Sequence, residues 1–213
     1  HLYQMKVPVF FADGLGNDTT LWMPMDQEVQ SFSVVIDFEP LMAIVDGKEE
    51  LSDAMADLML SIETPGLYNF THTNVKLDVS NAGQGTSIIR VADNFVAPYP
   101  PIITVPESQM VASTYHYWSI EGIMSQDFEA SAEFKYYGTS NNSNGYMDND
   151  LFVNDDNEQN LKMFYRLGAG YEWAELDTMN YEVITGSNTT NARGEIEVYS
   201  VALGEYQLVM SDP

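Results

Sequence analysis

The stretch FEASAEFKYYG, residues 128–138, and the stretch YHYWSIEGI, residues 115–123, begin the part of the sequence that decides the fold. Both are rich in aromatic and β-branched residues, which favour strands. Similar runs follow at spacings near ten residues, namely DLFVN (150–154), LKMFYRLG (161–168), YEWAEL (171–176), YEVIT (181–185), GEIEVYSV (194–201) and GEYQLVM (204–210). Short strands at this spacing are typical of an all-β sandwich or barrel.

The first part of the chain has the same strand-like composition. Its runs are YQMKVPVFF (3–11), TTLWMPM (19–25), SFSVVIDF (31–38) and MAIVD (42–46). The segments DGLGND and DQEVQ, which lie between these runs, have turn chemistry. The pattern predicts a four-stranded β unit over roughly residues 1–50.

One stretch, KEELSDAMADLMLSI at residues 48–62, has apolar residues at helical spacing. The residues that approximate a helical stripe are Leu51, Ala54, Leu58 and Met59. Ser52 or Asp53 is a suitable N-cap for such a helix. The overlapping run DLMLSIET is equally typical of the start of a strand, so both interpretations stay open.

We therefore predict an all-β chain of two consecutive β-sandwich-like modules. The smaller module covers residues 1–55, a connector that would accommodate a short helix covers 56–74, and the larger module covers 75–213. The Pro-rich stretch APYPPIITVPES, residues 97–108, predicts an irregular crossing loop or an edge segment. Two polar stretches predict hairpin loops, and they are GTSNNSNG (138–145) and TGSNTTNARG (185–194).

The charge balance excludes several classes of partner. The 213 residues include 8 basic and 32 acidic side chains, which gives a formal net charge of −24. Nucleic-acid binding needs clustered Lys and Arg, and an anionic membrane surface would repel this chain. The absence of cysteine excludes a disulfide framework and a Cys-based zinc site. No run approaches the length of an apolar transmembrane segment. Because HLYQMKVPVFF is neither an initiator Met nor a signal peptide, we expect a processed piece of a longer precursor.

The acidic stretch DNDLFVNDDNEQN, residues 148–160, is the one candidate metal site. It does not fit an EF-hand, which needs a Gly at position 6 and a Glu at position 12, in registers starting at Asp148 or Asn154. We predict a strand followed by a solvated turn, with Leu151 and Val153 on one face and Phe152 on the other. The alternative is a calcium site of another kind, and its ligands would be Asp148, Asp150, Asp155 and Asp156.

No local signature of catalysis is present. The only histidines are His1, His72 and His116, and neither an H-E-x-x-H nor a G-x-S-x-G motif occurs. Alternation places His116 on the same face as Trp118, as a half-buried or surface strand histidine. A carboxylate pair for glycoside hydrolysis would come from Glu121, Asp127 and Glu129, although such proximity is expected by chance among many acidic residues. A binding platform would come from Trp22, Trp118 and Trp173, although aromatic residues also suit sandwich cores.

Several phrases in order, FEPLMAIVDGKEELSDAMAD, IIRVADNFVAPYP, YHYWSIEGI, GYMDNDL and LGEYQLVM, resemble a known family. They are similar to the β-rich region that follows the catalytic domain in secreted Bacteroidota proteins of the aminopeptidase N-like gluzincin group. The resemblance implies that zinc and the catalytic glutamate belong to a parent domain N-terminal to His1. It also implies type IX secretion. Asp18-Thr19-Thr20 and Asp177-Thr178-Met179 resemble the O-glycosylation acceptor of Bacteroidota at Thr19 and Thr178.

These observations lead to one expected function and one alternative. We expect a non-catalytic accessory or packing β-module of a secreted or cell-surface zinc-aminopeptidase-like protein. Its partner would be the upstream catalytic-like domain or another protein of a surface complex. No catalytic residue and no cofactor is assigned within this chain, and whether the parent is an enzyme stays open. The alternative is a surface adhesion or glycan-binding β-sandwich protein that uses the aromatic platform. An independent hydrolase is the third and least supported reading.

Overall fold

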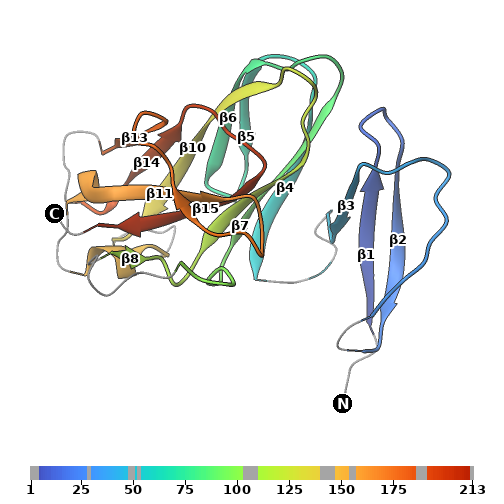
Figure 1. Ribbon diagram of the computed structural model, residues 1–213, viewed down its shortest axis with the longest axis horizontal. Coiled ribbons are helices and arrows are strands. Elements are labelled where there is room, and N and C mark those ends of the chain that lie inside the picture. The colour runs from blue at the N-terminus through green and yellow to red at the C-terminus, as the bar shows by residue number, and fades with distance from the viewer. Residues whose placement is uncertain are drawn as a thin grey trace.

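The computed structural model describes residues 5–27, 30–47, 51, 54–102, 110–139, 147–153, 157–185 and 191–211. Within these ranges the regular elements are strands, apart from two short 3-10 segments, and they form three antiparallel sheets (Figure 1). The predicted all-β class with sandwich-like modules is therefore confirmed. No helix with the length and apolar character needed to span a bilayer occurs in the described part of the chain.

The first sheet contains β1 (Met5–Ala12), β2 (Asp18–Met25) and β3 (Met42–Val45), in the order β2-β1-β3. The β1–β2 hairpin is closed by Asp13, whose carboxylate accepts hydrogen bonds from the Leu15 and Asn17 backbone N–H groups at 2.7 and 3.0 Å. Short polar side chains often bond to the backbone in this way at turns. The prediction of four strands in this part of the chain is wrong, because SFSVVIDF is not paired with any strand.

The two larger sheets face each other as a sandwich. The seven-stranded sheet has the order β12-β11-β15-β9-β7-β4, with β8 paired to β15, and the five-stranded sheet has the order β13-β14-β10-β6-β5. The strands of the first of these are β4 (Met55–Ile62), β7 (Ser87–Asn94), β8 (Val111–Ala112), β9 (Tyr117–Ile123), β11 (Leu161–Arg166), β12 (Ala174–Glu175) and β15 (Gly204–Met210). Those of the second are β5 (Gly66–Phe70), β6 (Val75–Asn81), β10 (Glu129–Tyr137), β13 (Tyr181–Ile184) and β14 (Arg193–Val198).

Residues 56–74 contain paired strands in place of the expected connector, and of the two interpretations left open for residues 48–62 the strand is the one observed, over Met55–Ile62. β4 pairs with β7 along its whole length, and β5 pairs with β6. Leu58 and Leu60 pack against the main core, whereas Met59 packs toward the first sheet. This alternation between two apolar environments suits a strand, since successive side chains of a strand point to opposite faces. The long-range pairing of β4 with β7 therefore outweighs the helical spacing of apolar residues in this stretch.

The main core lies between the two larger sheets. In β10 the side chains of Ala130, Ala132, Phe134 and Tyr136 are buried in alternation. Aromatic rings pack in series, with Trp118 and Phe134 centroids 5.3 Å apart and Phe134 and Tyr206 centroids 5.0 Å apart. Each large apolar side chain buried in this way contributes about 1.5–3 kcal/mol.

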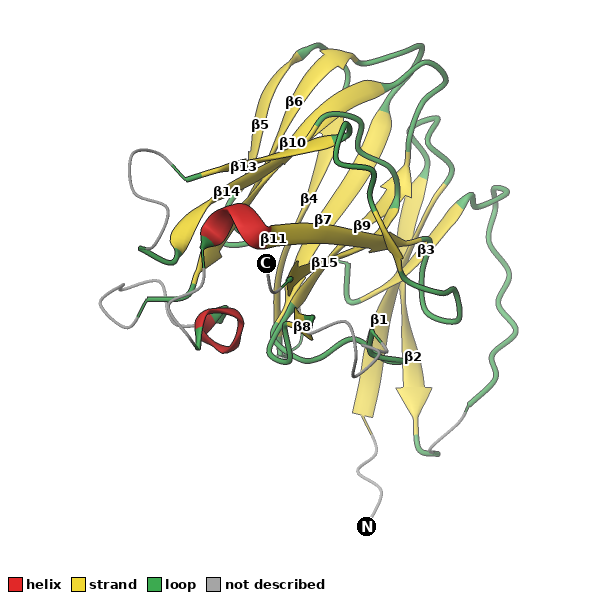
Figure 2. Ribbon diagram, turned by 60° about the vertical axis from the view of Figure 1, so that its left-hand side comes forward, coloured by secondary structure: helices red, strands yellow, loops and turns green. Residues whose placement is uncertain are grey.

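A second, smaller core joins the first sheet to the outer face of the seven-stranded sheet. Phe10, Ala12, Met42 and Ile44 of the first sheet are buried there. They pack against partly buried side chains of β4, β7 and β9, which are Met59, Ile88 and Ile123. The molecule therefore has three layers, and the seven-stranded sheet is the middle layer (Figures 1 and 2).

A glycine sets the close approach of β7 and β9. Gly122 has φ +133°, and a Cβ added to it would collide with the Ile88 carbonyl oxygen. We expect Gly122→Ala to lower the free energy of unfolding by about 3 kcal/mol, because neither backbone can move without breaking the ladder. Urea denaturation measures this change.

Gly85 provides the matched control. It has φ +107°, but a Cβ there meets no atom within 4 Å. Gly85→Ala therefore suffers the backbone strain without the collision. Equal losses in the two variants would show that the β7–β9 contact is not the cause.

Candidate functional site

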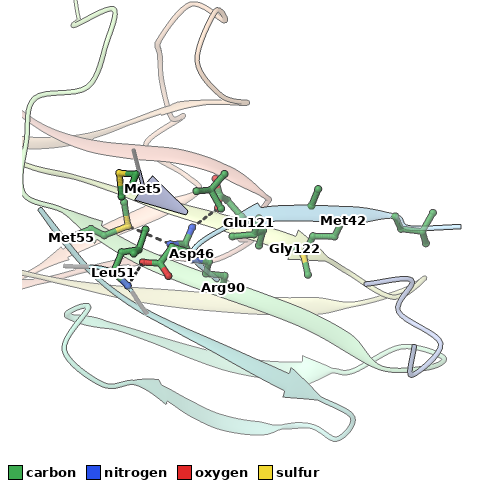
Figure 3. Close-up of a pocket in the computed structure, with 12 residues that line it drawn as sticks. Met5, Met42, Asp46, Leu51, Met55, Arg90, Glu121 and Gly122 are labelled. Carbon is green, nitrogen blue, oxygen red and sulfur yellow. Dashed lines mark hydrogen bonds and ion pairs between the residues drawn. The ribbon is translucent and has the colours of Figure 1, made fainter. Parts of the chain in front are cut away.

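A pocket of about 750 Å³ opens between the first sheet and the outer face of the seven-stranded sheet (Figure 3). Its floor comes from Arg90, Glu121 and Gly122 of β7 and β9, and its walls come from β1, β3 and the start of β4. Three methionines, Met5, Met42 and Met55, contribute to the walls. Methionine side chains are flexible and polarizable, so such walls adapt to the shape of what they contact.

Arg90 is the buried cation of this pocket. Its Nε donates to Asp57 of β4, its Nη1 donates to Glu121 Oε2 at 3.1 Å, and its Nη2 lies 3.3 Å from Met55 Sδ. Glu121 lies directly opposite Arg90 in the β7–β9 ladder, which is the position from which cross-strand charge pairs interact. Through these contacts the Arg90 guanidinium joins β7 to β4 and β9.

The described lining of the pocket has a negative balance of charge. Asp46 and Glu121 stand in its lining beside Arg90, and the Asp46 carboxylate accepts from the Leu51 N–H at 2.9 Å. None of the twelve described residues that line it is a Ser, Thr, Tyr, Lys or His, so its ionisable groups are Asp46, Arg90 and Glu121. The arrangement suits contact with an apolar or cationic group and disfavours an anion.

A second buried cluster lies at one end of the sandwich, around His116. The imidazole is only 2% exposed and precedes β9. Its Nδ1 lies 3.0 Å from Asp93 Oδ1, and its Nε2 lies 2.5 Å from Asp148 Oδ1. Asp93 also accepts from the Asn74 side-chain amide at 3.0 Å, and Asp148 accepts from the Tyr137 N–H at 2.7 Å. The cluster thereby ties both larger sheets together.

The two carboxylates decide the charge of His116. Burial by itself would lower its pKa, but the charge and the hydrogen bond of Asp148, together with Asp93, outweigh burial and raise the pKa to about 10. The ring is therefore a cation at neutral pH, and both ring nitrogens act as donors. Its edge also packs on Trp118, with ring centroids 4.6 Å apart. A histidine held in this way is a structural cation and not a general base.

The structure corrects the sequence prediction for His116. We predicted a half-buried or surface histidine, and it is buried. Its partners lie 23 and 32 residues away in the chain, so no local pattern points to them.

The predicted strand in DNDLFVNDDNEQN is wrong as well. Asn149–Phe152 forms the 3-10 segment η2, and Glu158–Asn160 forms η3. Leu151 is buried whereas Val153 is exposed, so these two side chains do not share a face. The physical reason is the contact between Asp148 and His116, which fixes Asp148 in the interior and turns the chain directly after it.

The candidate calcium ligands are only partly described. The Asp148 carboxylate is engaged by His116 and Tyr137, as above. Asp150 Oδ2 accepts from the backbone N–H and hydroxyl of Thr114 at 2.7 and 2.8 Å. Asp155 and Asp156 lie outside the described residues. Among the residues that are described, no group of three or more His, Asp or Glu side chains is arranged to hold a metal ion.

The other sequence candidates fall in separate places. Glu121 belongs to β9 and Glu129 to β10, which are in different sheets. Trp118 is in the main core and Trp22 is on β2, so the three tryptophans do not form one platform. Thr19 is half-buried on β2, whereas Thr178 is exposed.

Sequence analysis missed a third buried cation, Arg166. Its Nε lies 2.5 Å from Glu205, and its Nη groups donate to the Pro100 and Tyr99 carbonyls at 2.9 and 3.1 Å. Its guanidinium also lies 4.4 Å from the centroid of Trp173. The available signal was a charged residue inside an apolar run, LKMFYRLG, which often marks a buried ion pair.

No family model, curated protein or solved structure matches this chain.

The His116 cluster generates a pH prediction. The folded state holds the proton up to about pH 10, whereas an unfolded histidine releases it near its ordinary pKa of 6.5. The stabilisation is therefore complete below pH 6.5 and is lost as the pH rises through 10. We expect the free energy of unfolding of the wild type to fall over this interval, and His116→Asn to remove this part of the dependence. At pH 6 the variant should lose about 3–5 kcal/mol, because two buried carboxylates lose their cation.

His72→Asn is the control for this experiment. His72 is exposed and has φ +73°, a conformation that Asn tolerates well. This variant should keep the wild-type pH dependence. Urea titrations at pH 6, 8 and 10 measure both. A pH dependence that survives in His116→Asn would contradict the assignment of the proton to this ring.

The acidic stretch should bind calcium only diffusely, since a tight site needs about 6–8 oxygen ligands around one point. We expect the thermal midpoint to respond alike to calcium and magnesium. A preorganised site at a hundredfold excess of calcium over its Kd would instead add about 2.7 kcal/mol. Thermal unfolding in chelator, calcium and magnesium distinguishes the two. A calcium-specific rise that Asp150→Asn abolishes would establish the site that we argue against.

Proposed function

We propose that this chain is a non-catalytic accessory or packing module of a secreted or cell-surface zinc-aminopeptidase-like protein. The observation that carries the proposal is that the buried charged residues of the chain contact other groups of the fold. Every buried charged residue in the described part of the chain is engaged by another group of the fold. Catalytic groups must instead reach a substrate, usually in a cleft.

The three buried cations illustrate this use. Arg90 joins β4, β7 and β9, His116 joins the two larger sheets, and Arg166 holds the Tyr99–Pro100 segment. A buried ion pair of this kind brings little net stability, but the loss of one partner is costly. Such pairs fix the relative positions of strands, which is what a packing module requires.

The proposed partner is the upstream catalytic-like domain or another protein of the same surface complex. The family phrases described above support this partner. The alternative function, adhesion or glycan binding, is favoured by Tyr99, which is 85% exposed while Arg166 holds its carbonyl. An exposed aromatic side chain on a backbone held in this way is a suitable anchor for a partner or a sugar.

Zinc content and peptidase activity test the proposal at the level of the chain. The described residues offer neither a metal cluster nor a nucleophile beside a base in the pocket. The purified chain should therefore retain less than one zinc per molecule after dialysis and should not cleave aminoacyl or peptide reporters. Stoichiometric zinc, or hydrolysis abolished by a point mutation in the chain, contradicts the non-catalytic assignment.

Cross-linking of the parent protein tests the partner. The parent, purified from its source, should contain an H-E-x-x-H domain, and lysine- and carboxylate-directed cross-links should connect that domain to this chain. A parent of tandem β-sandwich repeats without a zinc motif would favour the adhesion alternative.

A further inference from the structure

The segment SFSVVIDF, residues 31–38, has the composition of a strand but no strand partner. It forms no strand and bends at residues 37–38, and its backbone makes no hydrogen bond with any other described residue. Three of its apolar side chains are presented to solvent, with Phe32 41%, Val34 40% and Val35 94% exposed. An exposed and unpaired strand-forming segment is a template for pairing with another chain.

The outer edge of β2 is unpaired as well. The hairpin is closed by the Asp13 N–H donating to the Asn17 carbonyl, and hydrogen-bonded pairs alternate from there along the β1–β2 ladder. The alternation directs the backbone N–H and C=O groups of Asp18, Thr20 and Trp22 away from β1. Among the described residues none bonds to that edge. Pro24, which has no N–H, ends the series of donors.

A groove of about 510 Å³ separates these two unpaired features. It is lined on one side by Gly16, Asn17, Asp18, Thr19 and Leu21, and on the other by residues 35–38. The connection from β2 to β3 runs along the side of β2 that faces away from β1 (Figures 1 and 2). An unpaired sheet edge of this kind is what β-strand addition uses.

The groove also has a charge preference. Asp18 lines it from β2, and Asp37 lines it from the opposite segment, and both side chains are exposed. None of the described residues in its lining is basic. The chain as a whole carries −24, so long-range attraction favours a basic partner and opposes a second copy of the same chain.

We propose that this groove binds an extended, basic strand of another polypeptide by β-strand addition to the outer edge of β2. The backbone of the added strand pairs with Asp18, Thr20 and Trp22. Its apolar side chains cover exposed side chains of the 31–38 segment, and a Lys or Arg meets Asp18 and Asp37. The inference does not rest on the proposed function, because the edge is open whatever parent protein carries it.

The test uses a capped peptide, acetyl-Lys-Thr-Val-Thr-Val-Thr-Lys-amide, and the intact chain. Calorimetry should show binding, and hydrogen exchange should show slower exchange of amides in residues 18–24 and 31–38. A matched peptide with Glu in place of both Lys residues should bind about tenfold more weakly, because attraction at two carboxylates becomes repulsion. A third peptide with Pro in place of the central Thr should not bind, since it cannot form the ladder.

Variants of the chain separate this groove from general acidity. Asp18→Asn with Asp37→Asn should abolish the preference for the Lys peptide over the Glu peptide. Asp78→Asn with Glu129→Gln makes the same change of charge at exposed positions of the five-stranded sheet and should leave the preference intact.

Four results would overturn the proposal. They are no binding of the Lys peptide at millimolar concentration, equal binding of the Pro peptide, protection confined to other strands, and an equal effect of the two double variants. Sedimentation that shows a concentration-dependent dimer with protection of residues 31–38 would assign the edge to a second copy instead.

Discussion

Strand β7 is covered on both faces, and the rest of the structure depends on this constraint. Ile89 and Val91 point into the main core, whereas Ile88 packs toward the first sheet. The same strand supplies Arg90 to the pocket and Asp93 to the His116 cluster. A strand in the middle layer must satisfy two cores at once, so its register with β4 and β9 admits little change. The fixed register accounts for the glycine at position 122, where β9 passes close to β7. It also accounts for the strand conformation of β4, which pairs with β7.

Three cations of the chain lie in its interior. The sequence has only 8 Lys and Arg residues, and two arginines and one histidine are buried beside carboxylates. The remaining acidic residues still greatly outnumber the remaining Lys and Arg residues. This excess of negative charge favours cationic partners and limits self-association.

The first sheet is the incomplete part of the fold. It has only three strands, its outer edge at β2 is open, and the segment that resembles a fourth strand lies apart from it. Both the pocket and the groove border this sheet, and carboxylates stand in the lining of each. The larger sandwich is in contrast closed by its aromatic core and its buried ion pairs. This difference supports the proposal that the first sheet binds a partner while the sandwich supports it.

The sequence by itself determined the all-β class, because alternation with period two is a local property that survives in isolated runs such as residues 128–138. It also determined the acidity and the lack of a recognisable catalytic motif. Only the tertiary structure decided that Met55–Ile62 is a strand, because its partner β7 lies some thirty residues further along the chain. Only the tertiary structure likewise decided the position of η2, which follows from the contact between Asp148 and His116. It also decided that SFSVVIDF, despite its strand propensity, pairs with no described strand. Local patterns state what a segment prefers, whereas pairing and buried charge depend on residues that are distant in sequence and adjacent only after folding.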